Sequence, residues 1–148
     1  MNEQSATTGY LAWQFSQVMG TRLEKELRAL DLTLAQHTAL MHIARSPGIS
    51  SADAARRTGV TAQSMGAAVN GLVDRGMLER RPHPTNRRVL CLHITDDGRR
   101  LTERAQAVVK DVNDAALSVL SPAEQATAHS LLYRLVAHLN PDALPPSA

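Results

Sequence analysis

Apolar residues recur at helical spacing along most of the chain, and polar or glycine-containing breaks divide this pattern into six segments. An apolar stripe at positions i, i+3, i+4 and i+7 is typical of a helix that buries one face. The predicted helices span residues 10–30, 34–44, 51–58, 62–75, 95–120 and 122–139. The first helix also carries Tyr10 and Trp13 away from its stripe, so we expect it to bury a second surface.

Residues that favour helix starts and helix ends support these boundaries. Four predicted starts follow a side chain that can accept a hydrogen bond from the first helical turn, namely Thr33, Ser50, Thr61 and Ser121. Pro122 and Glu124 stand at the first and third helical positions after Ser121, which is a strong start signal. Gly59 and Gly76 lie where two helices must end, and glycine is favoured there because it can adopt a positive φ.

Two β-like runs, residues 77–81 and 89–94, are separated by about seven residues and predict a hairpin. Alternation in the second run places Cys91 on the face opposite to Leu90, Leu92 and Ile94. Ile49 could add one short strand. We therefore expect a mostly α fold with a small β-wing (α+β), in which a helix-turn-helix precedes the wing.

Positive charge is concentrated in the middle of the chain. Residues 45–104 contain eleven basic and six acidic side chains, a local net charge of +5, whereas the whole chain carries only +2. Four of these cations flank the stiff loop in the run RRPHPTNRRVL, residues 80–90. Such a loop is either a solvated turn or a device that directs cations into a polyanion. In the second case Arg87 would insert into a DNA minor groove, and Arg88 would bind a phosphate or anchor the loop.

The predicted helix 62–75 has an apolar stripe on one side and small or polar side chains on the other. The second side presents Gln63, Ser64, Gly66, Ala67 and Asn70. Small residues let a helix enter a groove closely, and Gln or Asn can bind adenine bidentately in the major groove. Gly66 and Gly71 each cost about 1 kcal/mol of helix stability relative to Ala, which close approach would explain. A polar side that simply faces solvent is the alternative.

The run that starts ISSADAARR and ends HITDDG, residues 49–98, resembles the winged helix-turn-helix of the MarR family of bacterial transcriptional regulators. LVDRGMLERR followed by NRR carries most of the match. The resemblance extends over a single domain, residues 1–148. Within it we expect a DNA-binding lobe at 33–94, dimerisation helices at 8–30 and 96–140, and an extended or disordered tail at 141–148.

The resemblance implies a sequence-specific regulator, expected to be a repressor, that binds a pseudo-palindromic double-stranded DNA operator as a homodimer. It also implies release by a small aromatic or anionic effector, with no cofactor. The residues expected to contact DNA are Ser50, Thr61, Gln63, Ser64, Gly66, Ala67, Asn70, Arg80, Arg87 and Arg88. Trp13, His37 and Met41 could line an effector cleft between the two lobes, although core or dimer packing would also account for them.

Two features depart from the family pattern. Its wing commonly reads D-x-x-D-R-R, whereas His83 and Asn86 replace the two acids here. Asn86 offers only a neutral hydrogen bond, so the arginines lose an ion pair that would orient them. Ala54 and Thr58 stand where larger aliphatic residues are usual, so looser packing is expected beneath the short helix.

Other chemistry finds less support in the sequence. Cys91 could act as a thiol-based redox sensor, or it could be incidental to function. The six histidines show no recognisable ligand spacing, so no metal site is expected, and His37 is expected to be a hydrogen-bonded core residue. No glycine-rich phosphate loop or nucleophile elbow indicates an enzyme. A small-molecule-binding helical dimer that does not use DNA remains an alternative.

The sequence also bears on cellular location. A single cysteine fits a reducing compartment. The chain lacks both an apolar run of about 18 residues and the basic-then-apolar order of a secretory signal. We therefore expect a cytoplasmic protein without a membrane partner.

Overall fold

Residues 5–145 are described by the computed structural model, whose elements closely follow the predicted order. The α-helices are α1 (Thr8–Leu27), α2 (Leu34–Arg45), α3 (Ser51–Thr58), α4 (Ala62–Asp74), α5 (Asp96–Leu117) and α6 (Pro122–Leu139). A two-stranded antiparallel sheet joins β1 (Leu78–Pro82) to β2 (Leu90–Ile94). Two short 3-10 helices are η2 (Arg28–Leu30) and η3 (Pro141–Ala143). The predicted mostly α fold with a β-wing is confirmed.

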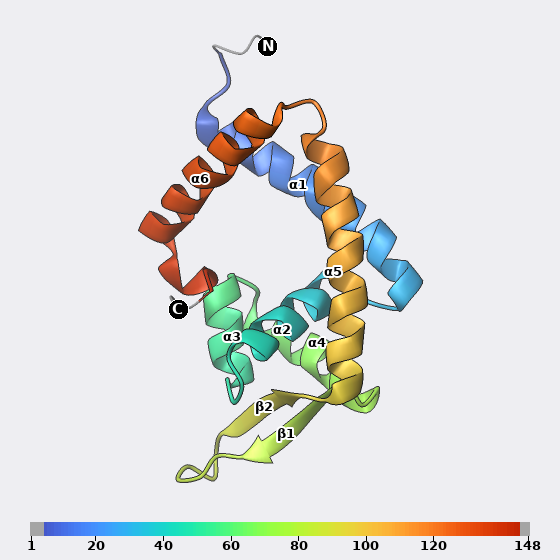
Figure 1. Ribbon diagram of the computed structural model, residues 1–148. Coiled ribbons are helices and arrows are strands. Elements are labelled where there is room, and N and C mark those ends of the chain that lie inside the picture. Colours follow the sequence, from blue (N-terminus) through green and yellow to red (C-terminus); the bar gives the residue numbers. More distant parts are fainter. Residues whose placement is uncertain (1–4, 146–148) are drawn as a thin grey trace.

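The elements form a lower lobe and an upper group of helices (Figure 1). The lower part, here called the winged-helix lobe, comprises α2, α3, α4, β1 and β2, with the β-hairpin at its far end. The outer helices α1 and α5 pack against each other. From the end of α5 the chain turns, and α6 descends so that η3 lies beside α3. The chain end is therefore brought back to the winged-helix lobe.

The predicted caps explain why the helices begin where they do. Thr33 and Ser121 each form a capping box, in which the side chain accepts from the third helical residue and that residue's side chain bonds back. Ser50 Oγ accepts from Asp53 N at 3.1 Å, and Thr61 Oγ1 accepts from Ser64 N at 3.1 Å. These contacts join residues three apart, so the local sequence is sufficient to specify them.

The structure differs from the predictions at the end of the first helix and in the tail, and contacts between distant parts of the chain lie at both places. The first helix changes to 3-10 geometry at Arg28, and Arg75 donates to the carbonyls of Leu30 and Asp31 just beyond it. The tail was expected to be extended or disordered, yet Pro141–Ala143 form a 3-10 turn against α3. Residues 146–148 of that tail lie outside the described residues.

The core lies mainly within the winged-helix lobe and beneath α5. Its largest fully buried side chains are Leu27, Leu32, Leu40, Ile43, Met65, Leu72, Leu78, Leu92 and Val69. Ile49 is not a strand residue, but its carbonyl accepts from Leu92 N at 3.0 Å, and Gly48 N donates to Leu92 O at 2.9 Å. The α2–α3 loop therefore extends the hydrogen bonding of β2.

One face of β2 differs from the predicted alternation. Cys91 is buried and Leu90 is half exposed, although the pattern placed Leu90 with Leu92. The α2–α3 loop packs against the side of the strand that carries Cys91 and His93. Gly48 of this loop lies beside the His93 ring, since a Cβ added to Gly48 would stand 3.8 Å from that ring. Leu90 sits near the hairpin tip, beyond the reach of the core.

The joint between the hairpin and α5 is unusually tight. Thr95 caps α5, and its N–H and hydroxyl both donate to Met77 O at 3.1 Å. Gly98 in the first turn lies against the same carbonyl, since a Cβ added there would stand 2.1 Å from Met77 O. Only glycine fits this position.

The surface of α1 and α6 is apolar to an unusual degree. None of the 18 residues of α6 is buried within the described chain. The exposed large hydrophobic side chains on the two helices are Tyr10, Leu11, Trp13, Phe15, Val18, Leu131, Leu132, Tyr133, Leu135, Val136 and Leu139. Within residues 5–145, no helix has the length and hydropathy needed to span a membrane.

Candidate nucleic-acid interface

The helix-turn-helix presents α4 on the protein surface. Met65, Ala68, Val69 and Leu72 bury one side of α4 against the lobe. The predicted contact residues Gln63, Ser64, Ala67 and Asn70 are exposed on the opposite side, and Gly66 is half buried. Thr61 and Ser50 cap α4 and α3, so both hydroxyls lie at helix N-termini. Helix N-termini present free N–H groups and are favourable positions for phosphate.

The two glycines of α4 have different surroundings. A Cβ at Gly71 would lie 2.8 Å from Gln36 Nε2, so Gly71 permits close packing of α4 on α2. A Cβ at Gly66 would meet nothing within 4 Å. The fold therefore requires a small residue at position 71, whereas the packing within the chain gives no reason for glycine at position 66.

A side-chain hydrogen bond connects α4 to the wing. Arg80 on β1 donates from its guanidinium to Asn70 Oδ1. Two of the predicted contact residues are thus brought together across elements that are adjacent in sequence. Asn70 keeps its amide N–H groups and a second oxygen lone pair available for another partner.

The wing loop is held by the two residues that replace the acids of the family pattern. His83 Nδ1 accepts from Thr85 N at 3.2 Å and from Asn86 N at 3.0 Å. Asn86 Oδ1 accepts from Arg88 N at 3.1 Å. An unprotonated imidazole nitrogen therefore performs the acceptor role that a carboxylate could fill, and the loop closes on itself.

Arg87 and Arg88 project from this loop into solvent. Both are exposed, and neither guanidinium makes a hydrogen bond or ion pair with another residue in the described part of the chain. Glu79 is instead paired with Arg81. The wing consequently carries two cations that no carboxylate of the described chain neutralises.

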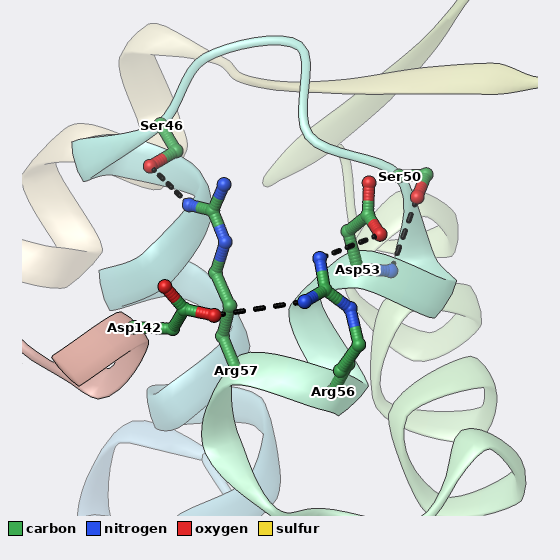
Figure 2. Close-up of polar contacts among 6 residues, drawn as sticks. All are labelled: Ser46, Ser50, Asp53, Arg56, Arg57 and Asp142. Atoms are coloured by element: carbon green, nitrogen blue, oxygen red, sulfur yellow. Dashed lines mark hydrogen bonds and ion pairs between the residues drawn. The ribbon is translucent and has the colours of Figure 1, made fainter. Parts of the chain in front are cut away.

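Polar contacts that join α3 to the end of α2 and to the segment after α6 were not predicted from the sequence. Arg57 Nη1 donates to Ser46 Oγ at 3.0 Å, and Arg56 lies between Asp53 at 3.2 Å and Asp142 at 3.6 Å (Figure 2). Asn140 Nδ2 also donates to Arg57 O at 3.3 Å. The arginine pair at the end of the short helix was the only available signal, and it did not identify partners about 85 residues away.

The three proposed effector residues lie on two helices, with Trp13 on α1 and with His37 and Met41 one turn apart on α2. Trp13 is 55% exposed and stacks at an angle on Tyr10, with ring centroids 6.3 Å apart, while Met41 is half buried on α2. His37 is 5% exposed, and its Nδ1 has no hydrogen-bond partner among the described residues. The expectation of a hydrogen-bonded core histidine was therefore wrong for that atom.

Cys91 is buried with 8% exposure, which restricts access of oxidants to its thiol. No group of three or more His, Cys, Asp or Glu side chains suited to a metal ion occurs within residues 5–145.

The two buried histidines of α2 predict that the fold loses stability in acid. Burial is the main cause that lowers the pKa of His37, and the positive charge of Arg45 lowers it further. Burial also lowers the pKa of His42, and the charges of Arg45 and Arg57 add smaller effects in the same direction. The unfolded chain then binds more protons below about pH 6.5 than the folded one. The free energy of unfolding should therefore fall by up to about 1.4 kcal/mol per histidine for each pH unit below that value.

Urea unfolding at pH 7.5 and 5.5 measures this loss. His37→Gln and His42→Gln should each reduce the difference between the two pH values, because glutamine does not titrate. An unchanged difference in the double variant would assign the acid sensitivity to other groups.

Comparison with known proteins gives consistent matches. A model of the MarR family matches residues 30–89. An HTH-type transcriptional repressor of Mycobacterium tuberculosis is 33% identical over 130 residues, which cover 88% of this chain and 94% of that protein. A M. tuberculosis MarR family protein in complex with DNA superposes with a TM-score of 0.78 at 33% identity, covering 88% of this chain and 98% of the other. A complex of a M. tuberculosis MarR family protein with salicylic acid superposes with a TM-score of 0.77 at 33% identity, covering 88% and 97%.

Proposed function

The chain belongs to the MarR family of transcriptional regulators, and from this premise we propose that it represses transcription by binding operator DNA as a homodimer. The exposed side of α4 enters the major groove, and the wing reaches the adjacent minor groove. The observation that carries this proposal is the pair of unneutralised arginines, Arg87 and Arg88, on a self-closed loop beside an exposed helix face. The DNA complex of the M. tuberculosis relative supports it.

Each predicted contact residue has a role in this arrangement. Gln63 and Asn70 are placed to read bases, while Gly66 and Ala67 let the helix backbone approach them. Arg80 holds Asn70 in position through their hydrogen bond. Ser50, Thr61 and Ser64 lie at or near helix N-termini, where hydroxyl and backbone N–H groups can bind phosphates.

The apolar faces of α1 and α6 support a homodimer. A helix without a buried residue gains little stability from its own chain, so α6 needs a partner surface. A two-fold axis between paired outer helices would present two copies of α4 to the same side of DNA. Half-sites are then expected about one helical turn, roughly 10 bp, apart.

The wing assignment is tested by Arg87→Ala. We expect weaker operator binding and a slope of log K against log salt that becomes less negative by about two units, because the homodimer loses one phosphate-neutralising contact in each half-site. Fluorescence anisotropy over a salt series measures both quantities. Arg104→Ala, which removes an exposed arginine from α5, is the matched control and should leave the slope unchanged. Loss of affinity without any change of slope for Arg87→Ala would contradict the assignment.

Asn70→Ala provides a contrasting result within the same assay. It should change base preference at one or two operator positions, since a side chain that reads bases discriminates among them by about 1–3 kcal/mol. A uniform loss over all operator variants would show that Asn70 acts only as an anchor for Arg80.

The effector is proposed to be a small aromatic acid that binds near Trp13, His37 and Met41. The unpaired Nδ1 of His37 offers a buried polar group to such a ligand, and the salicylic acid complex of the relative supports the chemical class. Salicylate should weaken operator binding by the wild-type protein, and Trp13→Ala together with Met41→Ala should reduce this effect. An equal effect of salicylate on the double variant would place the site elsewhere.

A further inference from the structure

The hydrogen bond between Asn70 and Arg80 limits what the exposed side of α4 can offer to a base. Asn70 lies on that side about two helical turns beyond Gln63. The residues between them on this side, Gly66 and Ala67, have no long side chain. Toward the C-terminal half of α4, the amide of Asn70 is therefore the group that a base would meet.

The pairing of the hairpin explains why Arg80 reaches Asn70. Leu78, two residues earlier on β1, points to the same face of the hairpin and is buried in the core. Arg80 leaves the strand on this face but is exposed at the surface, where it meets α4. Glu79 and Arg81 lie on the opposite face and pair with each other, and within residues 5–145 no carboxylate pairs with Arg80.

This contact changes the hydrogen-bonding character of Asn70. Arg80 donates to Asn70 Oδ1, so a cation occupies the acceptor end of the amide, while the two N–H groups of Nδ2 have no partner among the described residues. The oxygen has a second lone pair, but any further donor that approached it would meet the charge of the guanidinium at short range. A guanidinium itself has only donors. Asn70 and Arg80 together therefore present N–H donors to the groove.

Purines differ in what they offer to such a pair. Guanine presents two acceptors, N7 and O6, in the major groove, whereas adenine presents N7 beside the N6 amino donor. A free asparagine binds adenine because its oxygen accepts from N6 while its nitrogen donates to N7. When a cation holds that oxygen, the N6 amino group of adenine would face a positive charge, whereas both acceptors of guanine would face N–H groups. The tertiary contact therefore favours guanine, where Asn70 taken alone would favour adenine.

Building on the operator binding proposed above, we propose that Asn70 and Arg80 act as one unit that selects guanine in each operator half-site. Asn70 donates to the base, and Arg80 sets the preference by occupying Asn70 Oδ1. Arg80 is then a specificity-determining residue that acts on α4 from the wing. A substitution on β1 should consequently change the base that α4 reads.

Selection from a pool of randomised DNA duplexes with the full-length protein tests this unit. The position read by Asn70 is the one whose base preference changes in Asn70→Ala. There the wild type should enrich guanine over adenine by about tenfold, within the range for a specific base contact. Arg80→Ala should enrich adenine instead, because it frees Asn70 Oδ1. Arg81→Ala removes the neighbouring exposed arginine from the opposite face of β1 and, as the matched control, should keep guanine.

Affinities for the selected operator check the same contact base by base. Replacing the guanine of one half-site with adenine should weaken wild-type binding by about tenfold and strengthen binding by Arg80→Ala. Inosine keeps N7 and O6 and lacks only the minor-groove amino group, so it should bind like guanine. Fluorescence anisotropy with the three duplexes measures both effects.

The inference is wrong if Arg80→Ala still selects guanine, if the wild type selects adenine at this position, or if Asn70→Ala changes no position. Loss of affinity with inosine would also overturn it, because the guanine would then be read from the minor groove. In each of these cases an operator is still bound, so the proposed function stands. A pool in which the wild type enriches no sequence would contradict the proposed function itself, and this inference with it.

Discussion

Replacing Gly98 by alanine should destabilise the fold by about 3 kcal/mol or more, the upper part of the range for overpacked sites. The new methyl group would stand 2.1 Å from Met77 O and 2.8 Å from Ile94 Cγ1. A flexible side chain could move away, but Met77 O is a backbone atom held by Thr95. Relief therefore requires α5 to separate from the hairpin. Urea unfolding monitored by circular dichroism measures the loss.

Gly66→Ala is the matched control for this substitution. A Cβ at position 66 meets nothing within 4 Å, so the variant should be more stable by up to about 1 kcal/mol through helix propensity alone. If α4 enters the major groove closely, the same variant should bind operator less tightly despite its greater stability. Wild-type stability in Gly98→Ala would refute the tight joint between α5 and the hairpin.

Substituting Leu135 by aspartate should raise the dissociation constant of the proposed dimer by more than about a hundredfold. Two-fold symmetry places the change twice in the interface, and an unpaired buried charge costs several kcal/mol. Leu135 is 49% exposed within the chain and lies in the apolar surface of α6. Sedimentation over a concentration series measures the equilibrium, and operator affinity should fall in parallel because a single half-site then binds alone.

Ser130→Asp is the control for the dimer surface. Ser130 is exposed on the side of α6 opposite to Leu135, so the same charge there should leave the dimer intact. If Leu135→Asp remained dimeric at the concentrations where wild type does, the interface would have to be formed by other surfaces.

Much of the candidate site could be predicted because its determinants are local. The caps Thr61 and Ser50 bond to residues three positions on, and the spacing of apolar residues in α4 decides which side faces outward. The exposure of Arg87 follows from a hairpin loop too short and too polar to fold inward. These features depend on neighbours within one element, which a sequence pattern records directly.

The roles of individual residues were harder to predict where two elements meet. Gly66 and Gly71 look alike in sequence, yet one faces open space and the other faces Gln36 on α2. His83 departs from the family pattern, but its ring nitrogen accepts the backbone hydrogen bonds that close the wing. The identity of a residue does not reveal which partner the fold brings to it.

The sequence by itself determined the order of the elements, their capped starts, the outward side of α4 and the basic wing, because each depends on contacts a few residues apart. Only the tertiary structure decided that Cys91 is buried, that His37 Nδ1 lacks a partner, and that the C-terminal segment returns to α3. Asn140 and Arg57 are 83 residues apart in the chain. Contacts over such distances form only when all the intervening helices have packed, so no local pattern encodes them.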